Sequence, residues 1–203
     1  MTPERRGKLL QALNRRQPDL AVVLENVEDP RNVTAVMRSC DAVGIQDVYI
    51  ITNEGPRPEK YQFVSARSAD KWVTLHAFES LEECVAVLRS RYDRLLTTSL
   101  ADNSVSVYEV DFTQSTALVF GNERRGVSEQ MCALADGNIN IPQVGMLQSL
   151  NISVACAVCI YEAFRQKKAA GHYDKTALSP QRMDGLWERW TEGYETESWN
   201  YQP

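Results

Sequence analysis

Short, almost wholly apolar runs recur along the chain, separated by segments in which apolar residues return every three or four positions. The run Leu20–Val27, LAVVLENV, is rich in β-branched residues. Runs of this kind are typical of parallel strands covered on both faces. The pattern predicts strands at Leu20–Val27, Asp47–Ile51, Trp72–Leu75, Arg94–Leu100, Ala117–Phe120 and Asn138–Ile141.

Helical periodicity fills the intervals between these strands. In one such segment, Ser80 and Glu83 have the spacing of a capping box, just before an apolar stripe. The pattern predicts helices at 3–16, Asn32–Val43, Val64–Lys71, Ser80–Arg91, Ser128–Ala135 and Ser179–Trp190. Strands that alternate with helices predict an α/β fold, with a mostly parallel sheet and helices on both of its faces.

The stretch Asn138–Gln166 has the most unusual pattern. A short strand is followed by a Pro/Gly loop, Pro142–Gly145, and then by a long helix. The first half of this predicted helix carries Ser149, Asn151 and Ser153, whereas its second half is apolar. Because no polar face remains in mid-helix, we expect this helix to be buried nearly all round. Polar residues at the mouth of a buried helix suggest a ligand site.

Length and composition favour one globular domain with short helical extensions. The chain has 203 residues, of which 43% are hydrophobic and 24% charged. No run is apolar enough to span a membrane, and the first residues do not resemble a secretory signal. Five cysteines in apolar surroundings suit a reducing cytosol, so we expect a cytoplasmic protein. Its two histidines are isolated, which argues against a metal site.

Charge is unevenly distributed along the chain. The net charge is −5, but residues 1–20 carry +3 and residues 161–171 carry +2. Basic segments on an acidic body can contact phosphate locally, although solvated helix faces would give the same pattern.

Polar residues follow three of the predicted strands at their carboxyl ends, where open α/β sheets bind ligands. In the first loop, Asn32 either caps the next helix or faces the mouth of the loop. Arg38 either reaches round the side of that helix or forms a surface salt bridge. In the second loop, Gly121 would permit close backbone approach to a ligand, and Glu123 follows it. The third loop leads into the long helix.

Three segments occur in order between Leu20 and Gln166: DPRNVTAVMRSCDAVG, LVFGNERRGVS and NIPQVGMLQSLNISVACAVCIYEA. Together they closely resemble the three motifs of the TrmH (SpoU) family of RNA 2′-O-ribose methyltransferases, within the SPOUT superfamily. The resemblance implies a deep trefoil knot in the C-terminal half and a homodimer packed through the knot helices. It divides the chain into a basic N-terminal helix (1–19), a knotted methyltransferase core (20–168) and a helical tail (169–203).

The resemblance also implies S-adenosylmethionine as the methyl donor, with S-adenosylhomocysteine as its product, held mostly by backbone groups. By motif position, its binding residues would be Thr98, Leu100, Gly121, Ile141, Met146, Leu150 and Asn151. No Gly-x-Gly-x-x-Gly segment is present, so the usual dinucleotide cradle is absent. A sulfonium already makes its methyl group electrophilic, so we expect no metal.

The family's catalytic positions correspond to Asn32, Arg38, Glu123, Ser149 and Asn151. A guanidinium barely gives up its proton at neutral pH, so we expect Arg38 to bind the phosphate beside the target ribose and to stabilise the developing alkoxide. Asn32 and Asn151 would order the site by hydrogen bonds. Glu123 would fix the geometry of an Asn or Arg side chain, or accept the proton.

The basic helix directly before the first motif resembles that of family members acting on guanosine 18 in the D loop of tRNA. Another tRNA position, ribosomal RNA, or a non-catalytic RNA-binding role with the same fold remain alternatives. The expected RNA contacts are Arg5, Arg6, Lys8, Arg15, Arg16, Arg124, Arg165, Lys167 and Lys168.

Overall fold

The computed structural model describes residues 1–53, 70–101, 103–147 and 149–194. Its centre is a seven-stranded sheet of order β3-β2-β1-β6-β4-β7-β5, in which every paired strand is parallel. The strands are β1 (Gln17–Glu25), β2 (Ile45–Ile51), β3 (Thr74–Phe78), β4 (Arg94–Thr98), β5 (Val105–Ser106), β6 (Thr116–Phe120) and β7 (Gly137–Asn140).

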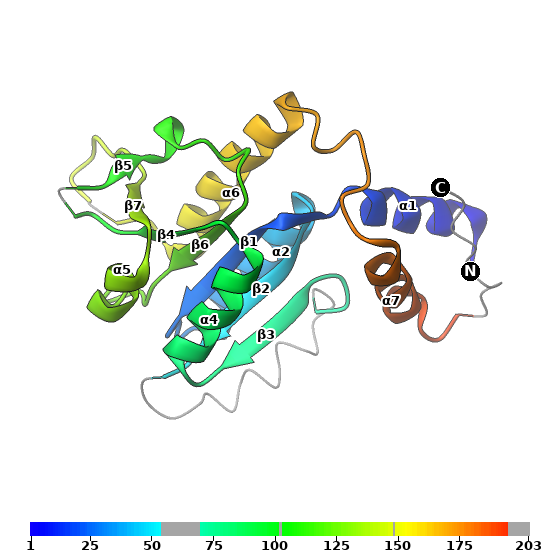
Figure 1. Cartoon of the computed structure of the whole chain (residues 1–203), viewed down its shortest axis with the longest axis horizontal. Helices are drawn as coiled ribbons and strands as arrows, with labels where there is room; N and C mark the ends of the chain where they lie inside the picture. Colours follow the sequence, from blue (N-terminus) through cyan, green and yellow to red (C-terminus); the bar gives the residue numbers. More distant parts are fainter. Residues whose placement is uncertain (54–69, 102, 148, 195–203) are drawn as a thin grey trace.

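Helices cover both faces of this sheet (Figure 1). The helices are α1 (Pro3–Asn14), α2 (Pro30–Ala42), α4 (Leu81–Arg91), α5 (Glu129–Leu134), α6 (Ile152–Ala169) and α7 (Pro180–Thr191), with a 3-10 turn η1 at Val107–Glu109. None of the described helices is both long and apolar enough to cross a membrane. The predicted α/β fold, a parallel sheet with helices on both faces, is confirmed.

Alternation along the central strand divides the core in two. Val22 and Leu24 point to the face that α2 and α6 cover, whereas Ala21 and Val23 point to the face that α4 and α5 cover. All four side chains are fully buried. The run that looked wholly apolar in the sequence is therefore a strand buried on both sides.

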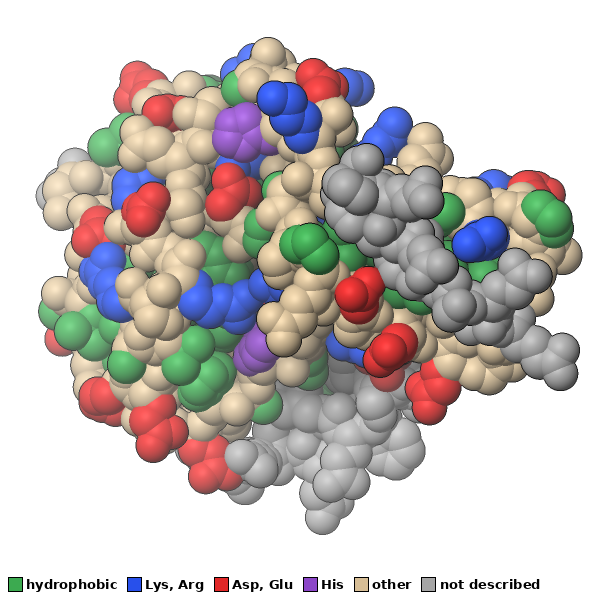
Figure 2. Space-filling view, turned by 45° about the vertical axis from the view of Figure 1, so that its right-hand side comes forward, with side chains coloured by type: hydrophobic (Ala, Val, Ile, Leu, Met, Phe, Trp, Pro, Cys, Tyr) green, Lys and Arg blue, Asp and Glu red, His purple; other side chains and the backbone are tan. Residues whose placement is uncertain are grey.

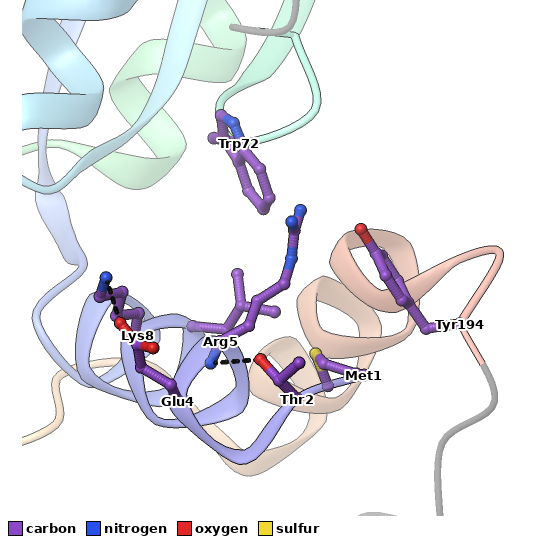
Figure 3. A pocket seen from close by; sticks show the side chains of 8 residues that line it. Met1, Thr2, Glu4, Arg5, Lys8, Trp72 and Tyr194 are labelled. Atoms are coloured by element: carbon purple, nitrogen blue, oxygen red, sulfur yellow. Dashed lines mark hydrogen bonds and ion pairs between the residues drawn. The ribbon is translucent and has the colours of Figure 1, made fainter.

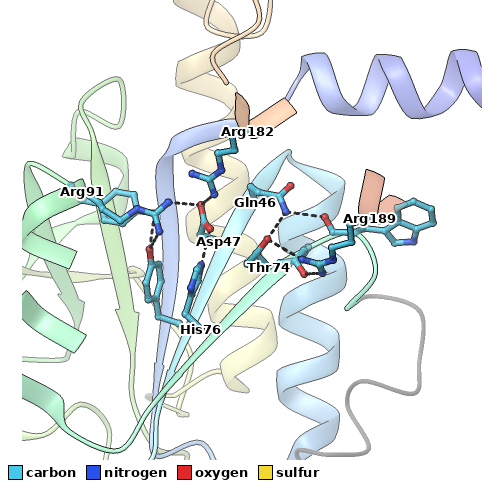
Figure 4. Close-up of polar contacts among 11 residues, drawn as sticks. Gln46, Asp47, Thr74, His76, Arg91, Arg182 and Arg189 are labelled. Carbon is cyan, nitrogen blue, oxygen red and sulfur yellow. Dashed lines mark hydrogen bonds and ion pairs between the residues drawn. The ribbon is translucent and has the colours of Figure 1, made fainter. Parts of the chain in front are cut away.

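A third apolar cluster lies beyond the sheet, where α1 and α7 pack together. Trp190 of α7 is fully buried, and its ring meets the ring of Trp72 edge to face, with 5.5 Å between their centroids. Arg182 and Arg189 of α7 bond to β2, to β3 and to the turn before β3 (Figure 4). The predicted tail helix therefore packs back onto the body of the protein.

Several predictions of local structure were wrong. The long helix begins at Ile152, so Ser149 and Asn151 precede it. The helix is not buried nearly all round, because Val154 is 48% exposed and Tyr161 is 50% exposed. Strand β5 was missed because two residues carry no periodic signal. The helix expected at Val64–Lys71 lies almost wholly outside the described residues.

All five cysteines are free, and four of them are buried.

Candidate active site

Three connections meet at the carboxyl edge of the sheet: β1 to α2, β6 to α5, and β7 to α6. Strands β1 and β6 are neighbours, and β4 joins β6 to β7. Since parallel strands all end at the same edge, the loops after them lie close together. This topology places Asn32, Glu123 and Asn151 beside one another, although up to 119 positions separate them in the sequence.

A chain of side-chain hydrogen bonds links the three loops. Asn151 Nδ2 donates to Asn32 Oδ1 at 3.2 Å, and Asn32 Nδ2 donates to Glu123 Oε1 at 2.8 Å. The second carboxylate oxygen of Glu123 accepts from the backbone N–H of Glu28 at 3.3 Å. Glu123 and Asn151 are exposed and Asn32 is half-buried, so this chain of polar groups can reach a ligand.

The N-cap of α2 decides whether Asn32 caps this helix or faces the mouth of the loop. Asp29 is the N-cap, because its side chain accepts from the backbone N–H of Arg31 at 2.8 Å. Asn32 therefore lies within the first turn, and its amide is committed to the other two loops. Asn151 instead caps α6, accepting from the N–H of Ser153 at 2.9 Å while donating to Asn32. The cap fixes the direction in which that donor points.

Asn122, which the sequence did not single out, shapes the second loop. Its Nδ2 donates to the carbonyl of Asn26 at 2.8 Å, and its Oδ1 accepts from the backbone of Arg124 at 2.9 Å. A Cβ on Gly121 would lie 2.1 Å from the backbone of Gly126. The close approach that requires glycine here is thus to the loop's own backbone. Asn26 has a positive φ of 52°, an uncommon conformation that asparagine tolerates.

Glu25 anchors the far end of the same loop. Its carboxylate is 1% exposed and accepts from Ser128 twice, at 2.8 Å from N–H and at 2.5 Å from Oγ. A buried carboxylate must be compensated by such donors. Glu25 ends β1 and Ser128 caps α5, so this contact ties the second loop to the strand that leads into the first.

The residues expected to bind the cofactor lie at the same edge. Thr98 ends β4, Gly121 directly follows β6 and Ile141 directly follows β7, and β4 pairs with both of the other strands. Leu100 and Met146 are 61% and 98% exposed, and Val144 and Leu147, which the sequence analysis had not named, are also exposed. Leu150 is 39% exposed. Apolar side chains beside strand-end backbone groups fit an adenine-bearing cofactor.

Arg38 and Ser149 are not joined to this hydrogen-bond chain. Both side chains are exposed, and neither makes a hydrogen bond or ion pair within the described part of the chain. The surface salt bridge considered for Arg38 is therefore not formed there. A guanidinium without an acidic partner remains available to a phosphate or an oxyanion.

Two of the expected RNA contacts are inside the protein. Arg16 is 2% exposed, bonds to Asp41 at 2.5 Å and lies 4.7 Å from the centre of the Trp190 ring. Lys167 is fully buried and bonds to Asp19 at 2.6 Å. Both expectations are corrected, because these cations hold elements of the fold together.

The other expected RNA contacts are exposed: Arg5, Arg6, Lys8, Arg15, Arg124, Arg165 and Lys168. Lys8 pairs with Glu4 at 2.9 Å, and Arg165 pairs with Glu162 at 2.7 Å. Both partners are exposed only in the Lys8–Glu4 pair, and an exposed pair contributes little energy, so Lys8 can exchange Glu4 for a phosphate. On the face shown in Figure 2, basic and acidic side chains are interspersed, so RNA contacts there would be local.

The parallel sheet, the three-loop polar site and the apolar side chains beside it are typical of α/β enzymes that bind ligands at the carboxyl edge of the sheet. The model of the SpoU rRNA Methylase family matches residues 19–161. The chain belongs to this family and is a methyltransferase.

Relatives match along nearly the whole chain. The tRNA (guanosine(18)-2′-O)-methyltransferase of Thermus thermophilus is 42% identical, covering 93% of this chain and 96% of its own length. The crystal structure of the Aquifex aeolicus TrmH/SpoU tRNA modifying enzyme has a TM-score of 0.82 at 35% identity, covering 92% of this chain and 94% of that one. The SpoU methyltransferase AviRb of Streptomyces viridochromogenes, solved with AdoMet, has a TM-score of 0.66 at 26% identity, covering 79% and 65%.

Proposed function

We propose that this protein transfers a methyl group from S-adenosylmethionine to the ribose 2′-hydroxyl of guanosine 18 in the D loop of tRNA, in the cytoplasm. The observation that carries the proposal is the hydrogen-bond chain from Asn151 through Asn32 to Glu123. Support for the substrate comes from the Thermus relative, which bears that activity in its name.

The chemistry needs an aligned hydroxyl, an outlet for its proton and the exclusion of water. S-adenosylmethionine supplies the electrophilic methyl group when bound. Asn32 is held at both ends of its amide, by Glu123 and by Asn151, so it orders the three loops around the substrate. Orientation of this kind supplies a large share of the lowering of the activation barrier in many enzymes.

Arg38 binds negative charge on the substrate, and Glu123 holds Asn32 in place and can accept a proton. The free Arg38 guanidinium binds the phosphate next to the target ribose and stabilises negative charge on the oxygen as its proton leaves. Glu123 accepts only two hydrogen bonds within the described residues, and two carboxylate oxygens have room for more. It therefore orients Asn32 and can still receive the proton.

A second copy of the chain would cover the apolar side chains that are exposed on α6 and on the loop before it. The exposed residues Val154 and Tyr161 lie on α6, and Met146 and Leu147 lie on the loop before it. Large apolar side chains exposed this close together favour association. We therefore propose a homodimer packed through α6. The trefoil knot stays a prediction.

The decisive experiment compares tRNA from cells with and without the gene by nucleoside analysis, together with the purified protein and a tRNA transcript. We expect one 2′-O-methylguanosine to be absent from the deletion strain and to be restored at position 18 by the protein with S-adenosylmethionine. A transcript with 2′-deoxyguanosine at position 18 should not react. Methylation at another tRNA position, or only of ribosomal RNA, would contradict guanosine 18 as the substrate. Binding of tRNA without methylation would contradict the proposal that the protein is catalytic.

The role of Arg38 has its own test. Arg38→Lys keeps the positive charge but loses the planar, bidentate donor. We expect kcat/KM for tRNA to fall about tenfold or more, as expected for the loss of one charge-assisted hydrogen bond. Arg89→Lys, on α4, is the matched control and should retain full activity. Near-native turnover of Arg38→Lys would exclude a bidentate role.

A further inference from the structure

A basic and aromatic cleft opens where α1 begins, at the opposite end of the protein from the candidate active site. Its volume is about 860 Å³, and Arg5, Lys8 and Leu9 of α1 line it together with Trp72 and Tyr194 (Figure 3). Trp72 precedes β3 and Tyr194 follows α7. The cleft therefore joins parts of the chain that are distant in sequence.

Cations and aromatic rings alternate around this cleft. The Arg5 guanidinium lies 5.0 Å from the centre of the Tyr194 ring. The Lys71 ammonium lies 5.6 Å from the centres of both the Trp72 and the Tyr194 rings. Aromatic and guanidinium planes are the surfaces on which proteins stack unpaired bases, and neighbouring lysines bind the phosphates.

Glu4 is the acidic residue that lines the cleft, and it offsets the positive charge there only weakly. Glu4 pairs with Lys8 at 2.9 Å, but the two side chains are 79% and 74% exposed, so water screens the pair. Arg5 and Lys71 have no acidic partner within the described residues. The cleft thus presents a net positive charge to a ligand although the whole protein is acidic.

Packing beneath the cleft holds its wall in place. Trp72 rests edge to face on Trp190, and Trp190 is fully buried with Arg16 over its ring. Arg189 of α7 donates to the carbonyl of Val73 at 2.7 Å, next to Trp72. An aromatic wall fixed in this way loses little freedom when a ligand stacks on it.

The position of the cleft indicates the kind of ligand. It lies at the amino edge of the sheet, whereas Asn32 and Glu123 lie at the carboxyl edge. Strand β1 runs between these edges with nine residues, which is about 30 Å at 3.3 Å per residue. A ligand that touches both regions of one protomer must be long, as tRNA is.

We propose that this cleft binds an unstacked base of the tRNA substrate, with the ring of Tyr194 against the base and Lys8 and Lys71 on the flanking phosphates. The inference rests on the proposed function. It adds a contact through a base to the phosphate contacts expected of the basic α1 helix.

The test uses two changes at one uncharged residue. Tyr194→Ala removes the ring, whereas Tyr194→Phe keeps it, and neither alters the charge of the protein. At fixed salt, we expect Tyr194→Ala to weaken binding of an unmodified tRNA transcript about tenfold, which is within the range for one stacked base. Tyr194→Phe should bind like the wild type. The slope of affinity against salt should be the same in all three proteins, because no phosphate contact is lost.

Equal affinity of Tyr194→Ala and wild type overturns the proposal, and so does an equal loss in Tyr194→Phe. Melting temperature and S-adenosylmethionine binding check that each variant is folded. If Tyr194→Ala does not fold, Tyr194→Leu, which keeps an apolar side chain but has no ring, must weaken tRNA binding for the proposal to stand. The proposed function fails separately, if the wild-type protein does not methylate tRNA.

Discussion

Two polar clusters lie at opposite edges of the same sheet, and they are built in opposite ways. At the amino edge, Asp47 of β2 is 1% exposed and meets three cationic or ionisable partners (Figure 4). His76 Nε2 lies 2.8 Å from one carboxylate oxygen, and Arg91 donates to the other at 3.2 Å. Arg182 of α7 also donates to it. At the carboxyl edge, Glu123 is exposed and meets an amide and a backbone N–H.

The comparison shows how a structural cluster differs from a site. Around Asp47 the charges are matched inside the protein, and the contacts join β2, β3, α4 and α7. Around Glu123 the partners are neutral, and Arg38, the expected cation, has no partner within the described residues. A buried carboxylate with matched cations serves the fold, whereas an exposed carboxylate with spare acceptor capacity can serve a ligand.

The largest effect should follow from removing the charge at the buried cluster. Asp47→Asn leaves Arg91 and Arg182 beside a neutral amide, and breaking a buried ion pair on one side costs about 3–5 kcal/mol. We expect urea unfolding to show a loss of this size. Asp93→Asn, at an exposed position before β4, should change stability by less than about 0.5 kcal/mol. A similarly small loss for Asp47→Asn would mean that the cluster does not hold α7 in place.

The same isosteric change at the other cluster should act on catalysis. Glu123→Gln cannot accept two hydrogen bonds in the same way, so Asn32 loses its fixed position. Displacement of a positioning group by about 1 Å can cost about 100-fold in rate, and we expect kcat/KM to fall by that factor. Stability should change by less than about 0.5 kcal/mol, because Glu123 is exposed.

Glu83→Gln, at an exposed position in the first turn of α4, is the matched control for both measurements. If Glu123→Gln instead unfolded the protein as Asp47→Asn should, the contrast between the two clusters would be wrong.

The sequence revealed one of these clusters and not the other. Glu123 and Asn151 follow predicted strands, so their place at the carboxyl edge could be predicted from the alternation of strands and helices. The partners of Asp47 could not, because Arg182 stands 135 positions away and no periodicity connects them. Arg16 and Lys167 show the same limit: in sequence they look like surface cations, and only the folded chain brings Asp41 and Asp19 to them.

Sequence signals predicted local structure correctly where the contacts involved lie within one helical turn. The capping box predicted at Ser80 is confirmed on its N-cap side, since Ser80 Oγ accepts from the N–H of Glu83 at 3.2 Å. The start of α6 was misplaced although asparagine favours an N-cap over a helix interior, and the contact of Asn151 with Asn32 depends on a distant loop. The hydrogen-bond chain of the site therefore needed the structure, although its members did not.

The smallest effect should appear in the dependence of stability on pH. Burial alone would raise the pKa of Asp47, but the hydrogen bond with His76 and the charges of Arg182 and Arg91 outweigh it, so the pKa lies below its ordinary value of 3.8. A carboxylate whose pKa is depressed in the folded state stabilises the fold above its unfolded pKa, and this contribution is lost as the pH falls through the folded value. The difference in unfolding free energy between wild type and Asp47→Asn should therefore shrink as the pH falls below the ordinary aspartate range. Urea titrations at pH 7, 5 and 3 measure this difference, and an unchanged value at pH 3 would show that the Asp47 charge is not what stabilises the cluster.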